Sequence, residues 1–214
     1  MKKVCLVLGA GRGIGATVAE KFALEGFHSH LCRRSDGGAL QESLDQIQSK
    51  GGEASGELIN AIDDGIIENK IESIEKDIGP IEVLIYNLGA QSGMKLLDDT
   101  SYKEFEWGWK MASFGLFRVA KTLCPLMSER GSGTIIATSA TAAMRGNKTQ
   151  HSHAAAMGSR RMLCQTLNDE FAEKGIHVAH VVVDGMVDAP DTLGKMLGDE
   201  LFNQLRETRG KEDG

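Results

Sequence analysis

Short runs of apolar and β-branched residues constrain the fold of this chain more than any other feature. Runs of four to eight such residues are typical of strands that are buried on both faces of a parallel sheet. Four runs of this kind are present, and two less regular runs predict further strands. In chain order the six are Val4–Leu8, Phe27–Cys32, Ala54–Ile59, Val83–Tyr86, Thr134–Thr138 and Val178–Val183.

Helical patterns fill the intervals between these runs. Their apolar residues recur every three or four positions, at Ile14–Glu25, Leu40–Lys50, Gly65–Asp77, Tyr102–Glu129 and His153–Glu173. Alternation of strands and helices predicts an α/β fold with a doubly wound parallel sheet, Rossmann-like, in three α/β/α layers. No linker or internal repeat interrupts the 214 residues, so we expect a single domain over 1–214.

The segment that follows the sixth expected strand is short. About 30 residues follow Asp184, and within 191–214 we expect a helix from Leu193 to Arg209 over the cleft, followed by a polar tail. No run in this segment predicts a seventh strand. Either the sequence is cut short before such a strand, or the sheet ends one strand early with an edge that needs cover.

Composition excludes several classes of protein. The chain carries 24 basic and 30 acidic side chains, a net charge of −6, which offers no basic footprint for nucleic acid. No apolar run approaches the ~18 residues of a membrane span, and we expect no secretory leader. Four scattered cysteines without a CxxC pair predict buried, reduced thiols and a cytoplasmic protein.

A glycine-rich segment, Gly9-Ala10-Gly11-Arg12-Gly13-Ile14-Gly15, follows the first expected strand and precedes a helix. Glycines let the backbone turn tightly and approach a ligand, and a helix start presents unbonded N–H groups to an anion. A dinucleotide pyrophosphate is the natural occupant, although the spacing is G-x-x-x-G-x-G and Ile14 takes the third position of GxGxxG. The alternative is a turn that uses glycine only for tight packing of helix on sheet.

The end of the second strand indicates which dinucleotide binds. A free ribose 2′-hydroxyl usually meets an acidic residue about 20 positions after the glycines. Here the sequence reads Arg33-Arg34-Ser35, with no carboxylate before Asp36. Arg12 and Arg33 could bracket a 2′-phosphate with their forked donors, which favours NADP(H) over NAD(H). The alternative is that these arginines are solvated surface charges.

Over about residues 3–190 the chain resembles the short-chain dehydrogenase/reductase family. Gly9, Gly13 and Gly15 occupy the glycine positions of that family, and Asn87-Leu88-Gly89-Ala90 resembles its Asn-Asn-Ala-Gly turn. The resemblance implies that Asn60 and the adjacent Ala61 lie at the adenine. It also implies that Val187 offers its backbone to the nicotinamide carboxamide.

The catalytic positions of the family carry other residue types in this chain. Its Tyr-x-x-x-Lys pair, in which the ammonium makes the phenol a usable acid, corresponds to His153 and Met157. Its serine and asparagine correspond to Ala140 and Ala112. Independently of alignment, the chain has only two tyrosines, Tyr86 and Tyr102, and neither has lysine four residues later.

Two hypotheses of function remain open. The first is an oxidoreductase of carbonyl or hydroxyl compounds with His153 as the acid, since histidine titrates near neutrality without help. Ser139 is a lesser candidate, because on a strand its side chain should point away from that of Ala140. The second is a catalytically silent dinucleotide-binding protein that serves as a sensor, a scaffold or a subunit partner.

Further patterns concern ligands and partners. Methionines on segments that flank the cleft favour a small apolar ligand: Met94, Met144, Met157 and Met186. The resemblance implies a homodimer or homotetramer through the two long helices, whose surplus apolar residues are Phe114, Phe117, Leu123, Leu163, Leu167 and Phe171. We expect no metal site, because the pair His28-x-His30 has no cysteine or carboxylate nearby to complete a zinc set.

Overall fold

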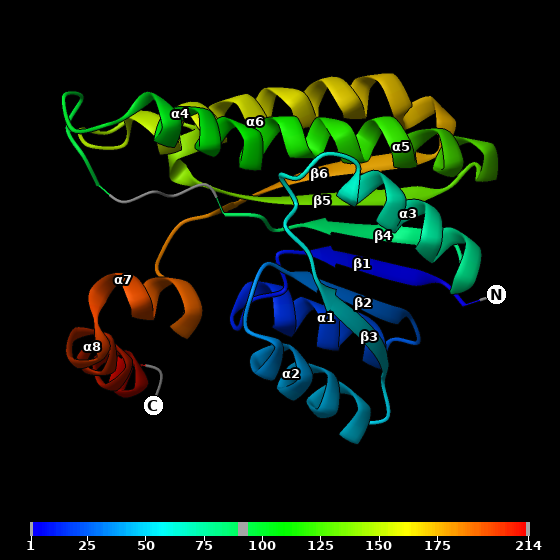
Figure 1. Ribbon diagram of the computed structural model, residues 1–214, viewed down its shortest axis with the longest axis horizontal. Coiled ribbons are helices and arrows are strands. Elements are labelled where there is room, and N and C mark those ends of the chain that lie inside the picture. Colours follow the sequence, from blue (N-terminus) through cyan, green and yellow to red (C-terminus); the bar gives the residue numbers. More distant parts are fainter. Residues whose placement is uncertain (1, 90–93, 213–214) are drawn as a thin grey trace.

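The computed structural model describes residues 2–89 and 94–212 and contains one parallel six-stranded sheet (Figure 1). The strand order is β3-β2-β1-β4-β5-β6, and all five neighbouring pairs are parallel. The doubly wound α/β prediction is therefore confirmed, with six strands in the described part of the chain. Their bounds are β1 Val4–Leu8, β2 His28–Arg33, β3 Glu53–Leu58, β4 Ile81–Tyr86, β5 Gly133–Ala140 and β6 Ile176–Val183.

Helices cover the two faces of the sheet in separate layers (Figure 1). On one face, Cys5 and Val7 of β1 pack in a cluster with residues of α1 Ile14–Leu24 and α2 Gly37–Ser49. On the other face, Leu6 and Leu8 pack with residues of α3 Ile66–Asp77, α5 Gly115–Arg130 and α6 His151–Phe171. The alternate residues of one buried strand thus supply both cores.

The helix expected over Tyr102–Glu129 contains an irregular turn. It forms α4 Tyr102–Trp109, a π-helical segment Lys110–Phe114 and α5. The carbonyl oxygen of Met111 accepts hydrogen bonds from the Tyr86 hydroxyl (2.6 Å) and the Arg160 guanidinium (3.5 Å). Arg160 also donates to the carbonyl of Ala112 at 3.1 Å. Side chains from outside the helix therefore satisfy carbonyls at the wide turn, a feature that periodicity alone cannot predict.

The segment after β6 differs from the single helix expected over Leu193–Arg209. A π-helical turn Pro190–Gly194 leads into α7 Lys195–Leu197, and α8 Asp199–Glu212 follows. Gly198, with φ of 80°, breaks the helix between them. Both helices lie beyond the carboxyl ends of the strands (Figure 1), and Arg206 of α8 binds the Asp188 carboxylate at 2.9 Å.

The two edges of the sheet differ in character. β3 carries two glutamates, Glu53 and Glu57, which oppose pairing with another strand. β6 has no charged residue, and Val181 and Val182 are exposed on it. The described part of the chain contains no strand beyond β6, so this edge, with exposed His177, Val181 and Val182, has no partner strand there.

The six apolar residues assigned to subunit contact divide into three groups, of which one, Leu163 and Phe171, is partly buried against the core. Leu123 and Leu167 are buried in the core of a single subunit, which corrects their assignment to a surplus. Phe114 and Phe117 are exposed, as is Met162 on the neighbouring α6.

Among the described residues, no helix is both long and apolar enough to cross a membrane. The four cysteines are buried and free, in agreement with the expectation from the sequence.

The histidine pair of β2 forms a polar ladder with the edge strand β3. Ser55 Oγ lies 2.7 Å from His28 Nε2 and 2.8 Å from His30 Nδ1. The other ring nitrogen of His30 lies 3.2 Å from Glu57 Oε1. The expectation that no carboxylate lies nearby was wrong, because the register of β2 with β3 places Glu53 opposite His28 and Glu57 diagonal to His30.

We expect this ladder to make the chain sensitive to acid. Burial lowers the pKa of both His28 and His30, more than the neighbouring glutamates raise them. The folded chain favours neutral rings, so their contribution is full above the ordinary histidine pKa of about 6.5 and is lost as the pH falls below it. The free energy of unfolding, measured by urea denaturation from about pH 7.5 to 5, should decrease less in His30→Gln than in the unmodified chain. A variant of exposed His151, His151→Gln, should keep the full decrease, and equal slopes in all three proteins would contradict the assignment.

Candidate nucleotide-binding crevice

The carboxyl ends of β1 and β4 meet at the centre of the sheet. The chain leaves β1 toward β2 on one side, whereas β4 leads to β5 on the other. Ligands of open α/β sheets bind in the crevice that opens where the strand order reverses in this way. The glycine-rich segment follows β1 and Asn87 follows β4, so both lie at this reversal.

Three glycines at the reversal admit no side chain. A Cβ on Gly9, whose φ is 92°, would lie 2.4 Å from the carbonyl oxygen of Asn87. A Cβ on Gly15 would lie 2.3 Å from the carbonyl oxygen of Gly9. A Cβ on Gly13, with φ of 127°, would lie 2.9 Å from Cβ of Ala189 in the segment after β6. Glycine is therefore required for close packing here, which is the alternative role considered for the motif.

The same segment also fits a pyrophosphate. α1 begins at Ile14, and its N-cap residue Gly13 provides no side-chain acceptor for the first N–H groups. The N–H of Ala16 donates to the carbonyl of Gly11 at 3.1 Å, and the N–H groups before it, together with the helix dipole, attract an anion. Gly11 and Ile14 are half-buried and Arg12 is exposed at the same place. The packing role and the binding role are therefore compatible in one backbone.

Asn87 joins the glycine segment to the neighbouring strand. Its side-chain amide donates to the carbonyl of Gly9 at 2.9 Å, and its side-chain oxygen accepts from the Thr138 hydroxyl at 2.7 Å. Its backbone N–H donates to the carbonyl of Leu8 at 2.8 Å. Asn87 is thus placed to hold the crevice in shape, and its side chain contacts protein on both sides. Gly89 is exposed nearby, and Ala90 lies outside the described residues.

The three arginines expected at the ribose lie in different environments. Arg33 is buried, donates from Nε to the carbonyl of Ser35 at 2.7 Å, and lies 3.7 Å from the Asp36 carboxylate. Arg34 is exposed, and Arg12 is exposed with its guanidinium 4.0 Å from Glu42. Arg12 and Arg34 therefore present charge at the protein surface, whereas Arg33 contacts the loop that follows β2.

The remaining cofactor candidates lie at the ends of β3 and β6. Asn60 follows β3 and donates to the Asp63 carboxylate at 2.8 Å, and Ala61 beside it is buried. Val187 is half-buried in the segment that brings Ala189 against Gly13. The structure thus brings segments from both halves of the sheet around one crevice.

Three of the four positions that the resemblance aligns with catalytic residues come together, and these three are apolar. Ala112 and Met157 are buried in one small cluster, and Ala140 packs against it. The residues come from the π-helical segment, the second turn of α6 and the end of β5. No hydroxyl, amide or ammonium group is contributed by these three side chains.

Ser139 does not point away from this cluster, contrary to the strand expectation. It is buried, and its hydroxyl lies 3.5 Å from the sulfur of Met157. β5 ends at Ala140 and enters a 3₁₀ turn, Thr141–Ala143, so the neighbouring Ala140 packs against the same cluster. Ser139 thus lies at the site but is engaged by Met157.

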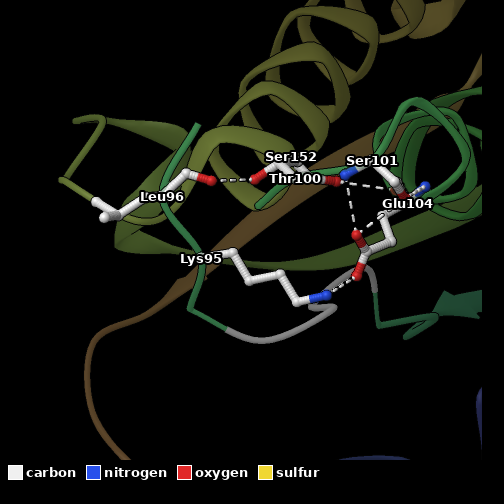
Figure 2. A network of polar contacts seen from close by, with 6 residues as sticks. All are labelled: Lys95, Leu96, Thr100, Ser101, Glu104 and Ser152. Atoms are coloured by element: carbon white, nitrogen blue, oxygen red, sulfur yellow. Dashed lines mark hydrogen bonds and ion pairs between the residues drawn. The ribbon is translucent and has the colours of Figure 1, made fainter. Parts of the chain in front are cut away.

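The start of α6, which carries half-buried His153, is fixed by a network of polar contacts (Figure 2). Ser152 donates to the carbonyl of Glu104 at 3.1 Å, and Lys95 forms an ion pair with the Glu104 carboxylate. Ser101 and Glu104 form a capping box that begins α4. Hydrogen bonds from Lys95 and from Ser101 lower the pKa of Glu104 to about 2, so it stays charged at neutral pH.

Comparison with known proteins agrees with this geometry. Residues 3–196 match the model of the short chain dehydrogenase family. The chain belongs to the short-chain dehydrogenase family. It is similar to the 3-oxoacyl-[acyl-carrier-protein] reductase FabG of Escherichia coli K12, with 30% identity over 89% of this chain and 75% of that protein. The FabG of Staphylococcus epidermidis RP62A is 27% identical over 100% of this chain and 87% of the relative.

Solved structures of the short-chain dehydrogenase family share the fold. A short-chain dehydrogenase from Rhodopseudomonas palustris has a TM-score of 0.80 and 31% identity, covering 84% of both chains. A gluconate 5-dehydrogenase from Burkholderia cenocepacia J2315, solved in complex with NADP and tartrate, has a TM-score of 0.77 and 25% identity. That likeness covers 85% of this chain and 71% of the other.

Sequence reasoning missed three residues at this short-chain dehydrogenase crevice. Arg160 is buried behind Met157, Tyr86 lies beneath its guanidinium, and Gly115 leaves room for the Tyr86 hydroxyl. A signal for Arg160 exists, because it falls between Met157 and Cys164 at helical spacing on the buried stripe of α6. An arginine at an apolar position of such a stripe indicates a buried charge with a structural partner.

Gly15 offers a direct test of the close packing. In Gly15→Ala the new Cβ would meet backbone atoms of Gly9 and Ala10, which cannot move without opening the crevice. We expect a loss of about 2 kcal/mol or more in the free energy of unfolding, measured by urea denaturation. A matched control, Gly146→Ala, adds its Cβ where no atom lies within 4 Å and should change stability little. Equal effects of the two substitutions would contradict this packing.

Proposed function

We propose that this chain binds NADP(H) in the crevice at the β1–β4 reversal and reduces a small apolar carbonyl compound slowly, with His153 as proton donor. The observation that carries the proposal is the glycine cradle, with the open start of α1 packed against Asn87. Gly9, Gly13 and Gly15 would hold the pyrophosphate through backbone N–H groups. Asn60 and Ala61 would lie at the adenine, and Val187 at the nicotinamide.

The preference for NADP(H) over NAD(H) rests on the arginines. Exposed Arg34 and Arg12 provide guanidinium groups at the end of β2 and in the glycine segment. Two forked donors suit a phosphate monoester, whereas a ribose hydroxyl pair would favour a carboxylate. The neighbouring gluconate 5-dehydrogenase was solved in complex with NADP, which supports the same preference.

The chemistry follows from what the side chains at the crevice can do. A bound NADPH supplies a hydride. His153 would donate the proton that the carbonyl oxygen then requires, since imidazole is an acid–base group in the neutral range. The side chains of Ala112, Ala140 and Met157 exclude water. They carry no hydrogen-bond donor that could orient the substrate carbonyl. Because the substitution of a well-placed acid costs typically ~10²–10⁴ in rate, we expect slow turnover.

A second candidate function is favoured by the apolar cluster itself. No polar group among Ala112, Ala140 and Met157 can hold a carbonyl oxygen, and Ser139 is engaged by the Met157 sulfur. Under this proposal the chain binds NADP(H) without turnover and acts as a sensor, a scaffold or a subunit partner. The two functions share one binding site and differ only in the role of His153.

The chain's ligand and partners follow from its exposed apolar side chains. Met94, Met144 and Met186 are exposed on the segments that flank the crevice, and adaptable thioethers suit an apolar ligand. Exposed aromatics of α4, the π-helical segment and α5 would form a homodimer or homotetramer contact with a second copy. They include Phe117, and Phe114 stacked on Trp109. We further propose a cytoplasmic protein, supported by its four free buried cysteines.

Turnover and its dependence on His153 test the proposed chemistry. The full chain is incubated with NADPH and a panel of ketones, aldehydes and quinones, and nicotinamide absorbance is followed. We expect slow oxidation of NADPH that falls at least roughly tenfold in His153→Ala, because the proton donor is removed. His151→Ala, on the exposed side of the same helix turn, serves as the control and should retain the rate.

The outcomes separate the two functions. Tight NADPH binding with no turnover across the panel would reject the reductase and support the silent binding protein. Turnover that persists in His153→Ala would reject the role of His153. Absence of NADPH binding would reject both functions.

The role of the exposed arginines is tested by comparing cofactors. In Arg34→Ala we expect the dissociation constant of NADPH to rise by about tenfold, since a charged hydrogen bond to phosphate is lost, while that of NADH changes little. Isothermal titration calorimetry measures both constants. The matched control is Arg145→Ala, an exposed arginine outside the glycine and β2 segments. Equal losses for NADPH and NADH would show that Arg34 does not recognise the 2′-phosphate.

A further inference from the structure

Arg160 of α6 is 1% exposed, and its guanidinium donates only to backbone carbonyls. Nε donates to Ala112 at 3.1 Å and Nη1 to Thr138 at 2.6 Å. Nη2 donates to Leu88 at 2.7 Å and more weakly to Met111 at 3.5 Å. The acceptors belong to the π-helical segment, to β5 and to the turn after β4.

The positive charge of Arg160 has no ionic partner. Among the side chains that the structure describes, no carboxylate lies within ion-pair distance of its guanidinium. Its other close neighbour is the ring of Tyr86, whose centroid lies 5.1 Å from the central guanidinium carbon. Burial lowers the pKa of Arg160, but arginine remains protonated in proteins at ordinary pH. A full positive charge is therefore buried, balanced only by carbonyl dipoles and the tyrosine ring.

This charge lies directly behind the crevice. Arg160 follows Met157 by three residues, so both lie on the same face of α6. Two of its acceptors, Ala112 and Leu88, belong to segments that border the crevice, and Thr138 lies two residues before Ala140. Met157 carries no charge at the position nearer the ligand. The crevice thus has an apolar surface with a fixed cation beneath it.

We propose that Arg160 makes the crevice discriminate between the oxidation states of the cofactor, so that NADPH binds more tightly than NADP⁺. The inference rests on the proposed NADP(H) site. The two forms share the same phosphates and adenosine, but the nicotinamide ring is neutral in NADPH and positively charged in NADP⁺. A buried cation raises the free energy of the oxidised form alone.

The apolar cluster strengthens the effect. Ala112, Ala140 and Met157 supply no dipole that could turn toward a cationic ring, and they keep water away from the guanidinium. Lys95, which belongs to the polar network at the start of α6, is neutralised by Glu104 (Figure 2). Asp184 at the end of β6 is exposed, so solvent screens its attraction for a cation. In an effective dielectric of about 20, two like charges at a separation on the order of 10 Å shift an equilibrium constant by roughly tenfold, which sets the scale of effect that a binding measurement must detect.

The test uses the full chain and titrates NADPH and NADP⁺ separately by calorimetry. We expect the dissociation constant of NADP⁺ to exceed that of NADPH by about tenfold in the unmodified chain. In Arg160→Met, which removes the charge and keeps an unbranched apolar side chain two atoms shorter, the ratio should approach one through tighter binding of NADP⁺. Arg160→Lys keeps the charge and should keep a ratio well above one, even though fewer carbonyls are satisfied.

A purely structural role for Arg160 would weaken both forms equally and leave the ratio unchanged. Arg130→Met is the matched control, because Arg130 binds Glu75 at the far end of α5 and its loss should lower stability without changing the ratio. A ratio that survives in Arg160→Met overturns the inference. If that variant does not fold, equal affinities for the two forms in the unmodified chain overturn it instead. Failure to bind either form rejects the NADP(H) site itself, a result distinct from equal binding of both.

Discussion

The hydrogen bonds of Arg160 join the parts of the molecule on which the crevice depends. One guanidinium binds carbonyls of the π-helical segment, of β5 and of the turn after β4, and so sets the distance of α6 from the sheet. Asn87 continues this linkage to the glycine segment through Gly9 and Thr138. Because buried carbonyls without donors are costly, these few side chains hold the irregular backbone that borders the crevice.

The fold followed from the sequence where a local pattern had a single structural solution. Val4–Leu8 could be buried on both faces only in a sheet with helices on each side, and the structure has that arrangement. The π-helical segment did not follow, because its cause lies in Tyr86 and Arg160, which are distant in the sequence. The break at Gly198 was also missed, since a glycine within an amphipathic pattern does not by itself show which backbone conformation it adopts.

The candidate site was predictable to the extent that backbone, not side chains, defines it. Gly9, Gly13 and Gly15 lie where the motif predicts them. At each position a Cβ would come too close to a neighbouring atom, so only glycine fits. The environments of Arg33 and Ser139 were less predictable. Arg33 is held by its own loop and Ser139 by Met157, and both contacts depend on side-chain directions at the ends of strands.

Backbone recognition and side-chain chemistry can therefore vary independently in this crevice. A pyrophosphate is held by N–H groups, which every sequence with the right glycines provides, whereas a carbonyl substrate must be oriented by particular side chains. Here the glycine cradle is intact and the positions that would orient a substrate are Ala112, Ala140 and Met157. Such a crevice retains the backbone features that suit a dinucleotide. In the proposed complex, the nicotinamide ring would lie in the field of the buried Arg160 charge without contacting it. Discrimination between the cofactor forms thus needs one buried charge, whereas catalysis needs several side chains placed around the substrate.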